Sequence, residues 1–210
     1  MERYKSGWLA TAEAAQEIQA EVKMDAREHT RLIRSLEQAR NRHVDVDGRR
    51  IPESISILIS MLSREFERNA RYDLYYHITM ECRLTNSVEL QLQFSEKQYR
   101  EFQDINSLIC YSEALVNAGY TNDGLERSRD SLEMAIRDRR LINHAAVSYI
   151  RNSIEAKSAE AVNVAIKSLI LSIDMPRGED SVLEIDWITK ARMLGADPKL
   201  LSAVEGLGGN

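Results

Sequence analysis

Residues that interrupt helices are scarce in this chain, and this scarcity restricts its fold more than any other feature. Only nine glycines and three prolines occur in 210 residues, and residues 8–42 contain neither type. Glycine and proline mark the turns that a many-stranded protein needs, so their low number favours long helices over a β architecture. The sequence therefore predicts a mostly α fold.

The N-terminal stretch carries a heptad-like apolar seam, which predicts one long helix within residues 1–42 and a coiled-coil or oligomerisation segment. The apolar side chains of the seam that we select as interface candidates are Ile18, Val22, Leu32 and Leu36. Asp25 and His29 interrupt the seam. They fit either a carboxylate that orients a histidine in a metal or proton-transfer site, or, as we prefer, a polar layer between helices.

Two segments of the central region, residues 43–94, suggest β structure. Asp47-Gly48 is a turn signal that predicts a small hairpin or a tight loop. Farther along, apolar side chains occupy alternate positions in two runs on either side of Thr85-Asn86-Ser87. This period of two predicts an antiparallel β-hairpin over about residues 72–94. Between these segments, Pro52 and the apolar residues that follow it predict a buried helix, and the alternation of serines with isoleucines leaves a strand as the second choice.

Residues 95–210 contain start and stop signals for several helices. A capping box at Ser95–Gln98 and a serine at position 158 predict helix starts, and Gly119 and Gly195 predict helix ends. A second capping box, Ser181–Glu184, precedes another helical segment, and Asp197-Pro198 precedes the last. Residues 121–124 are interpreted as a turn. The region should form a helical bundle or an array of helical hairpins.

The stretch ALVNAGYTNDGLERSRDSLEMA, around Gly119, resembles the tetratricopeptide pattern, and residues 145–169 resemble it again. Both stretches lack the aromatic signature positions of that family. The resemblance therefore implies helical-hairpin packing and nothing about a ligand.

Composition and motifs exclude several functional classes. The net charge of -5 argues against a surface built for nucleic acid, and the two cysteines have no paired spacing. No phosphate loop, nucleophile elbow or metal-ligand motif is present, and the four histidines are scattered over separate elements. We therefore expect a soluble, cytoplasmic protein with no cofactor, no metal and no membrane partner.

The densest positive charge of the helical half lies in AIRDRRLINHAAVS, where Arg137, Arg139 and Arg140 precede His144. Four residues separate Arg139 from His144, a spacing similar to that of HEPN nucleases. The resemblance implies an arginine that steadies a phosphate and a histidine that handles the ribose proton. Two structural alternatives are a helix end whose arginines complement the carbonyl dipole, and one long helix over residues 122–157 with a solvated charged belt.

Three functional hypotheses remain. The preferred one is a non-enzymatic protein–protein interaction or assembly protein that forms a homo-oligomer through its first helix and the hairpin, with Arg137 and Arg140 as further interface candidates. The second is a helical ribonuclease that uses Arg139 and His144. The third is a helical-hairpin adaptor that binds a peptide.

Overall fold

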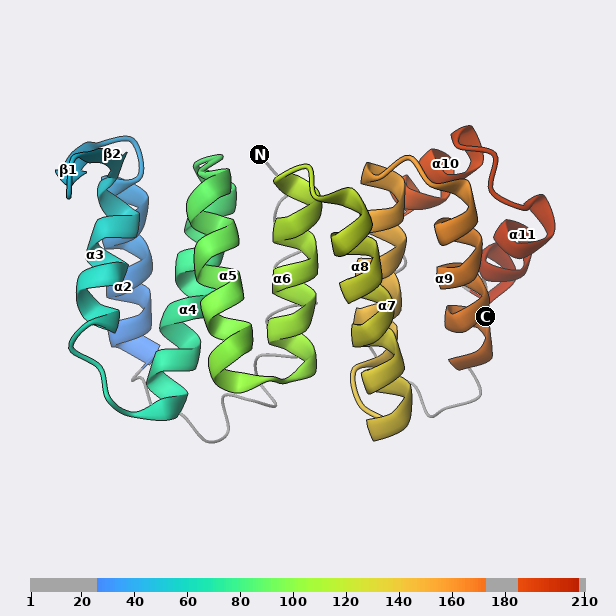
Figure 1. Cartoon of the computed structure of the whole chain (residues 1–210), viewed down its shortest axis with the longest axis horizontal. Coiled ribbons are helices and arrows are strands. Elements are labelled where there is room, and N and C mark those ends of the chain that lie inside the picture. Colours follow the sequence, from blue (N-terminus) through green and yellow to red (C-terminus); the bar gives the residue numbers. More distant parts are fainter. Residues whose placement is uncertain (1–25, 173–184, 208–210) are drawn as a thin grey trace. The chain divides into compact units, whose positions relative to one another are not determined.

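The computed structural model describes residues 26–172 and 185–207, and most of these residues are helical (Figure 1). In chain order the elements are α2 (Ala26–Ala39), β1 (His43–Val46), β2 (Arg49–Pro52), α3 (Glu53–Leu62), α4 (Arg68–Leu84), α5 (Val88–Phe102), α6 (Ile105–Asn117), α7 (Thr121–Asp138), α8 (Ile142–Glu155), α9 (Ala159–Ser172), α10 (Ile185–Met193) and α11 (Pro198–Leu207). The mostly α class predicted from the sequence is confirmed.

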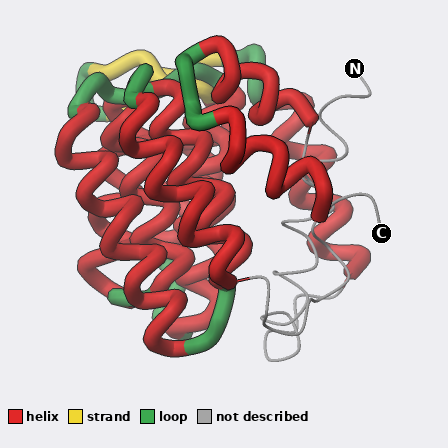
Figure 2. The backbone as a smooth tube through the Cα atoms, turned by 90° about the vertical axis from the view of Figure 1, so that its right-hand side faces the viewer, coloured by secondary structure: helices red, strands yellow, loops and turns green. Residues whose placement is uncertain are grey.

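The two strands form a small antiparallel hairpin, shown in yellow in Figure 2. Val46 pairs with Arg49, so Asp47 and Gly48 alone form the turn, and both have positive φ, 51° and 78°. A two-residue turn of this kind matches the twist of the strands that it joins. The hairpin expected at Asp47-Gly48 is confirmed.

The hairpin predicted at residues 72–94 is wrong, because these residues belong to helices α4 and α5. Leu74, Ile78 and Cys82 lie four positions apart, so they share one face of a helix as readily as one face of a strand. All three are buried, and so is Tyr75, which the alternating pattern assigned to the polar face.

Three helix boundaries differ from the predicted ones in related ways. Thr85-Asn86-Ser87, expected between strands, ends α4 instead. Ser95 is not a helix cap, because it lies inside α5 and its hydroxyl donates to the Gln91 carbonyl. Residues 121–124, expected as a turn, form the start of α7. Polar residues of these types satisfy backbone groups inside helices as well as at turns, so their identity alone did not locate the boundaries.

One turn geometry recurs along the chain. Five helices end with a residue of this geometry in the left-handed region: Asn86, Gly119, Arg139, Lys157 and Gly195, which follow α4, α6, α7, α8 and α10. After each of them, the next backbone N–H donates to the carbonyl five residues earlier, as Tyr120 does to Leu115. This is the Schellman pattern, which satisfies the last carbonyls of a helix and reverses the chain direction. The predicted helix ends at Gly119 and Gly195 are confirmed.

Two of the predicted helix starts are confirmed by side-chain caps. The Ser158 hydroxyl accepts a hydrogen bond from the Ala161 N–H at 3.2 Å, at the start of α9. The Asp197 carboxylate accepts one from the Lys199 N–H at 2.9 Å, at the start of α11. The capping box at Ser181–Glu184 lies outside the described residues.

The described chain divides between Phe102 and Gln103 into two compact units. The core of the first unit contains Leu36 of α2, Leu58 of α3, Ile78 of α4 and Phe94 of α5, and Leu32 packs against it. The core of the second unit contains small and branched apolar residues from α6 to α11. Small core residues let helices approach closely, which suits stacked helical hairpins.

Candidate binding surface on helices α6 and α8

The arginine-rich stretch forms the turn between α7 and α8. Helix α7 ends at Asp138, Arg139 adopts the left-handed conformation, and the Arg140 N–H donates to the Ala135 carbonyl at 3.1 Å. Leu141 is also left-handed, and α8 begins at Ile142. The prediction of a single helix over residues 122–157 is therefore wrong, because two residues in the left-handed conformation separate α7 from α8.

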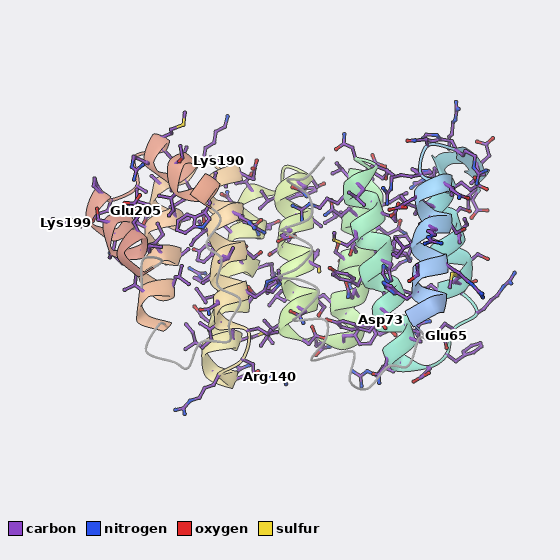
Figure 3. All side chains as sticks on the ribbon, turned by 180° about the vertical axis from the view of Figure 1, so that it is seen from behind. Glu65, Asp73, Arg140, Lys190, Lys199 and Glu205 are labelled. Carbon is purple, nitrogen blue, oxygen red and sulfur yellow. The ribbon has the colours of Figure 1, made fainter. Side chains whose placement is uncertain are left out.

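The three arginines of this turn are exposed to solvent. Arg137 donates from Nε to Oδ1 of Asp138 at 3.1 Å, and Arg140 extends beyond the end of α7 (Figure 3). An exposed ion pair between neighbouring residues contributes little to stability. The turn thus presents positive charge to solvent.

His144 lies in the first turn of α8 and is half-buried. Burial lowers the pKa of His144, the carboxylate of Glu113 on α6 partly opposes this shift, and the positive charge of Arg151 adds to it. The charges that act on the imidazole therefore come from Glu113, on α6, and from Arg151, which lies two helical turns after His144 on α8. A lowered pKa keeps the imidazole neutral at pH 7.

Ser148 connects the same carboxylate to α8. Its hydroxyl donates to Oε1 of Glu113 at 3.0 Å, and the side chain is buried. A serine nucleophile requires a base that accepts its proton and a hydroxyl that substrate can reach. Here a carboxylate accepts the hydrogen bond of the hydroxyl, but the hydroxyl is buried, so the arrangement fits a polar contact between two helices.

We call Glu113, His144, Ser148 and Arg151 the α6–α8 polar cluster. Three of its four side chains, those of Glu113, His144 and Arg151, are half-buried, so part of each remains open to solvent. Together they offer a carboxylate acceptor, a neutral imidazole and a guanidinium donor on two adjacent helices. Such a set can hydrogen-bond to the backbone or to the polar side chains of a bound segment.

A second polar group includes residues next to this cluster in the sequence of α6 and α8, and the sequence pattern did not predict it. Asn152 of α8 donates from Nδ2 to the Ser112 hydroxyl of α6 at 3.1 Å and to the Ser128 hydroxyl of α7 at 2.8 Å. All three side chains are buried. The contact connects three helices at one point. The only signal for it in the sequence is a small polar residue at a buried helical position, which an apolar pattern treats as an interruption.

The histidines are closer together than the sequence suggested. The rings of His29, on α2, and His77, on α4, lie with their centroids 5.4 Å apart. Burial lowers the pKa of His77 to about 4, the charge of His29 adds to this, and Glu81 opposes it. Within residues 26–172 and 185–207, no group of three or more histidine, cysteine or acidic side chains is placed to hold a metal ion.

The predicted interface residues fall into three groups. Leu36 is buried in the core of the first unit and Leu32 packs against that core, so both have partners inside the chain. Arg137 and Arg140 are exposed at the α7–α8 turn. Ile18 and Val22 lie outside the described residues.

Among the residues that the structure describes, none of the helices combines the length and the apolar character that a membrane span requires. Comparison with protein-family models, with curated proteins and with solved structures finds no match to this chain.

Proposed function

We propose that this chain is a non-enzymatic interaction protein, a scaffold of helical hairpins whose α6–α8 polar cluster contacts a segment of a partner protein. The observation that carries the proposal is the recurrence of one helix-ending turn, at Asn86 in the first unit and at Gly119, Arg139, Lys157 and Gly195 in the second. Repeated helical hairpins stack side by side and create extended surfaces, which proteins of this type use for binding.

The chemistry of the α6–α8 polar cluster supports a protein ligand over a small reactive substrate. Glu113 and Arg151 carry opposite charges, and His144 is held neutral by burial. Half-buried groups of both signs of charge can pair with the hydrogen-bond donors and acceptors of a polypeptide. The buried Ser148 hydroxyl, bonded to the carboxylate, supplies no nucleophile.

Affinity capture from the source cells tests this proposal. The bait is the tagged full chain, and the variants are Glu113→Gln combined with Arg151→Gln, and Lys167→Gln as a control on the exposed side of α9. We expect proteins that are enriched with the wild type and the control to be lost or strongly reduced with the double variant. Equal enrichment with all three baits, or none with the wild type, would contradict the proposal.

Self-association through the first helix belongs to the same proposal. Its support is the N-terminal part of the seam, which contains Ile18 and Val22. Leu32 and Leu36, farther along the seam, pack inside the chain. Light scattering of the full chain should give a mass above 24.0 kDa, and a chain that starts at residue 26 should give a monomer. A monomeric full chain at micromolar concentration rejects this part.

The proposal places the protein in the cytoplasm. Neither Cys82 nor Cys110 belongs to a disulfide bond, and the Cys82 thiol is buried. Free thiols persist in reducing compartments. Fractionation of source cells with an antibody against the chain tests the assignment.

A ribonuclease assay decides the competing hypothesis. We expect no cleavage of single-stranded RNA by the wild type. The charges that act on His144 belong to Glu113 and Arg151 and not to Arg139, its partner in the nuclease hypothesis. Cleavage that is lost in both Arg139→Gln and His144→Gln would replace the interaction proposal with the nuclease.

A further inference from the structure

Every backbone N–H group of the loop between α3 and α4, residues 63–67, donates a hydrogen bond. The N–H groups of Ser63, Arg64 and Glu65 donate to carbonyls of the last turn of α3. The N–H groups of Phe66 and Glu67 both donate to Oε1 of Glu65, each at 2.9 Å. No N–H group of this loop lacks an acceptor. These hydrogen bonds, within the loop and to α3, favour the observed conformation of the loop backbone.

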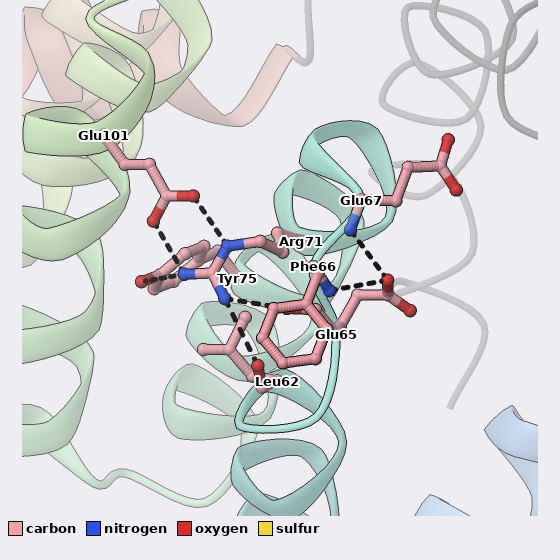
Figure 4. Close-up of polar contacts among 7 residues, drawn as sticks. All are labelled: Leu62, Glu65, Phe66, Glu67, Arg71, Tyr75 and Glu101. Carbon is pink, nitrogen blue, oxygen red and sulfur yellow. Dashed lines mark hydrogen bonds and ion pairs between the residues drawn. The ribbon is translucent and has the colours of Figure 1, made fainter.

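Arg71 attaches the loop to helices α4 and α5. Its Nη1 donates to the carbonyl of Leu62, the last residue of α3, at 3.3 Å and to the carbonyl of Glu65, in the loop, at 3.1 Å. Its Nε and Nη2 donate to the two carboxylate oxygens of Glu101 at 2.7 and 2.9 Å. Figure 4 shows the guanidinium between Glu101 and the loop. Because guanidinium is planar, this two-pronged contact also sets its orientation.

The loop of residues 63–67 carries the most exposed large apolar side chain of the described residues. Phe66 is 89% exposed, and Met193, at 83%, is the next. Single apolar side chains are common on protein surfaces. Phe66 differs because the backbone on both sides of it is held by Glu65 and Arg71, while its ring contributes nothing to the core of the unit that carries it.

We propose that Phe66 is a preorganised anchor that inserts into an apolar pocket of a partner protein. Aromatic side chains that enter a pocket dominate the binding energy of many interfaces. A loop held in its bound conformation before the encounter loses little further entropy on binding. The residues that flank the ring, Arg64, Glu67 and Arg68, are exposed and carry both signs of charge, as the polar rim of a protein interface does.

The same flanking charges argue against a lipid surface. Anionic head groups attract basic residues, but here the carboxylates of Glu65 and Glu67 stand on either side of Phe66. One aromatic ring without a basic cluster supplies too little apolar area for stable membrane binding. The partner that fits is a folded protein with an apolar pocket and a rim of mixed charge.

This inference rests on the proposed interaction function but names a different surface, on the first compact unit. Variants at Phe66 leave the α6–α8 polar cluster intact, and variants at Glu113 and Arg151 leave the loop intact. The two proposals can therefore fail separately.

Photo-crosslinking in the source cells tests the anchor. The full chain carries p-benzoylphenylalanine in place of Phe66, or in place of Met193 as the matched exposed control. We expect a discrete adduct from position 66 whose partner peptide lines an apolar pocket of another protein, and no such adduct from position 193.

The partner identified in this way is then purified and its affinity measured. Phe66→Ala should weaken binding by about 30-fold or more, the loss typical of an interface hot spot. Glu65→Ala keeps the ring but frees two N–H groups of the loop, so we expect a several-fold loss. Met193→Ala should bind like the wild type, and circular dichroism should show that all variants are folded.

Four results would overturn the anchor. They are no adduct at position 66, an adduct only with a second copy of this chain, unchanged affinity of Phe66→Ala, and Phe66-dependent binding to vesicles of equal parts phosphatidylcholine and phosphatidylglycerol. A partner that binds the wild type and Phe66→Ala equally rejects the anchor alone. Absence of any partner in both the capture and the crosslinking experiments rejects the interaction function as well.

Discussion

His77 shows how a residue's chemistry depends on side chains that are distant in the sequence. In sequence it is a histidine of the predicted hairpin over residues 72–94, for which an ordinary pKa is expected. In the structure it is half-buried, and the His29 ring from α2 lies 5.4 Å from its own. Burial first, and then the second imidazole, disfavour its protonated form.

This environment predicts a dependence of stability on pH. The folded-state pKa of His77, about 4, lies below the ordinary value of 6.5, so the unfolded chain binds the proton more tightly. The stabilisation is complete above pH 6.5 and is lost as the pH falls toward 4, by up to about 3 kcal/mol. Urea unfolding between pH 7 and pH 4 measures this loss.

The control variants separate His77 from other groups. His77→Gln should flatten the dependence on pH, whereas His43→Gln, at an exposed position of β1, should leave it unchanged. His144, whose pKa burial also lowers, should account for part of the remaining slope. If the free energy of unfolding depends on pH equally in the wild type and in His77→Gln, the pair of imidazoles does not control this dependence.

At the scale of elements, the hairpin turns depend on a single backbone conformation. Gly119 and Gly195 adopt the left-handed region without a Cβ, but Lys157 adopts it with one, at φ 54°. A side chain in this region costs free energy, which only glycine avoids. The α8–α9 turn is thus held by its hydrogen bonds against the preference of its own residue.

The same substitution should therefore have opposite effects at two lysines. Lys157→Gly should raise the free energy of unfolding by a few tenths of a kcal/mol to about 1 kcal/mol. Lys167→Gly, inside α9, should lower it by about 1 kcal/mol, because glycine disfavours a helix interior. Thermal unfolding followed by circular dichroism compares the two; a loss of stability in both variants would contradict the role of the turn.

Close approach of helices α6 and α7 explains why residue 124 is a glycine. A Cβ on this residue of α7 would lie 2.5 Å from Cγ2 of Val116 and 3.0 Å from its backbone nitrogen, on α6. Backbone atoms cannot move aside as a flexible side chain can, so the helices would have to separate.

Gly124→Ala should therefore destabilise the chain by about 1–3 kcal/mol, although alanine favours helices. Asn122→Ala, on the exposed first turn of the same helix, is the control and should change little. Urea unfolding gives both values. Stabilisation by Gly124→Ala would mean that helix propensity outweighs the contact with α6.

At the scale of the whole molecule, each compact unit has its own apolar core. A unit with a core of its own can fold alone. We expect residues 103–210, expressed as a fragment, to be helical and to unfold cooperatively in urea. A fragment with the far-ultraviolet spectrum of a random coil would show that this unit requires the first one.

Local signals in the sequence predicted the helical class, the Asp47-Gly48 hairpin and the helix ends at Gly119 and Gly195. The class follows from the scarcity of glycine and proline, and the turns depend on a few adjacent residues that adopt a positive φ or lack a Cβ. The alternating run at residues 72–94 failed, because its apolar positions also satisfy a helical period. Which period applies was decided by the burial of Tyr75 and Thr79 against neighbouring helices.

The sequence by itself therefore determined the secondary-structure class and several of the points where helices reverse, because these depend on local conformational preference. Only the tertiary structure decided which polar residues meet. Asn152 reaches Ser112 and Ser128, Glu113 reaches Ser148, and Arg71 holds the loop that carries Phe66. These contacts join residues that are distant along the chain or lie on different elements, and packing brings them together, so no short stretch of sequence contains them.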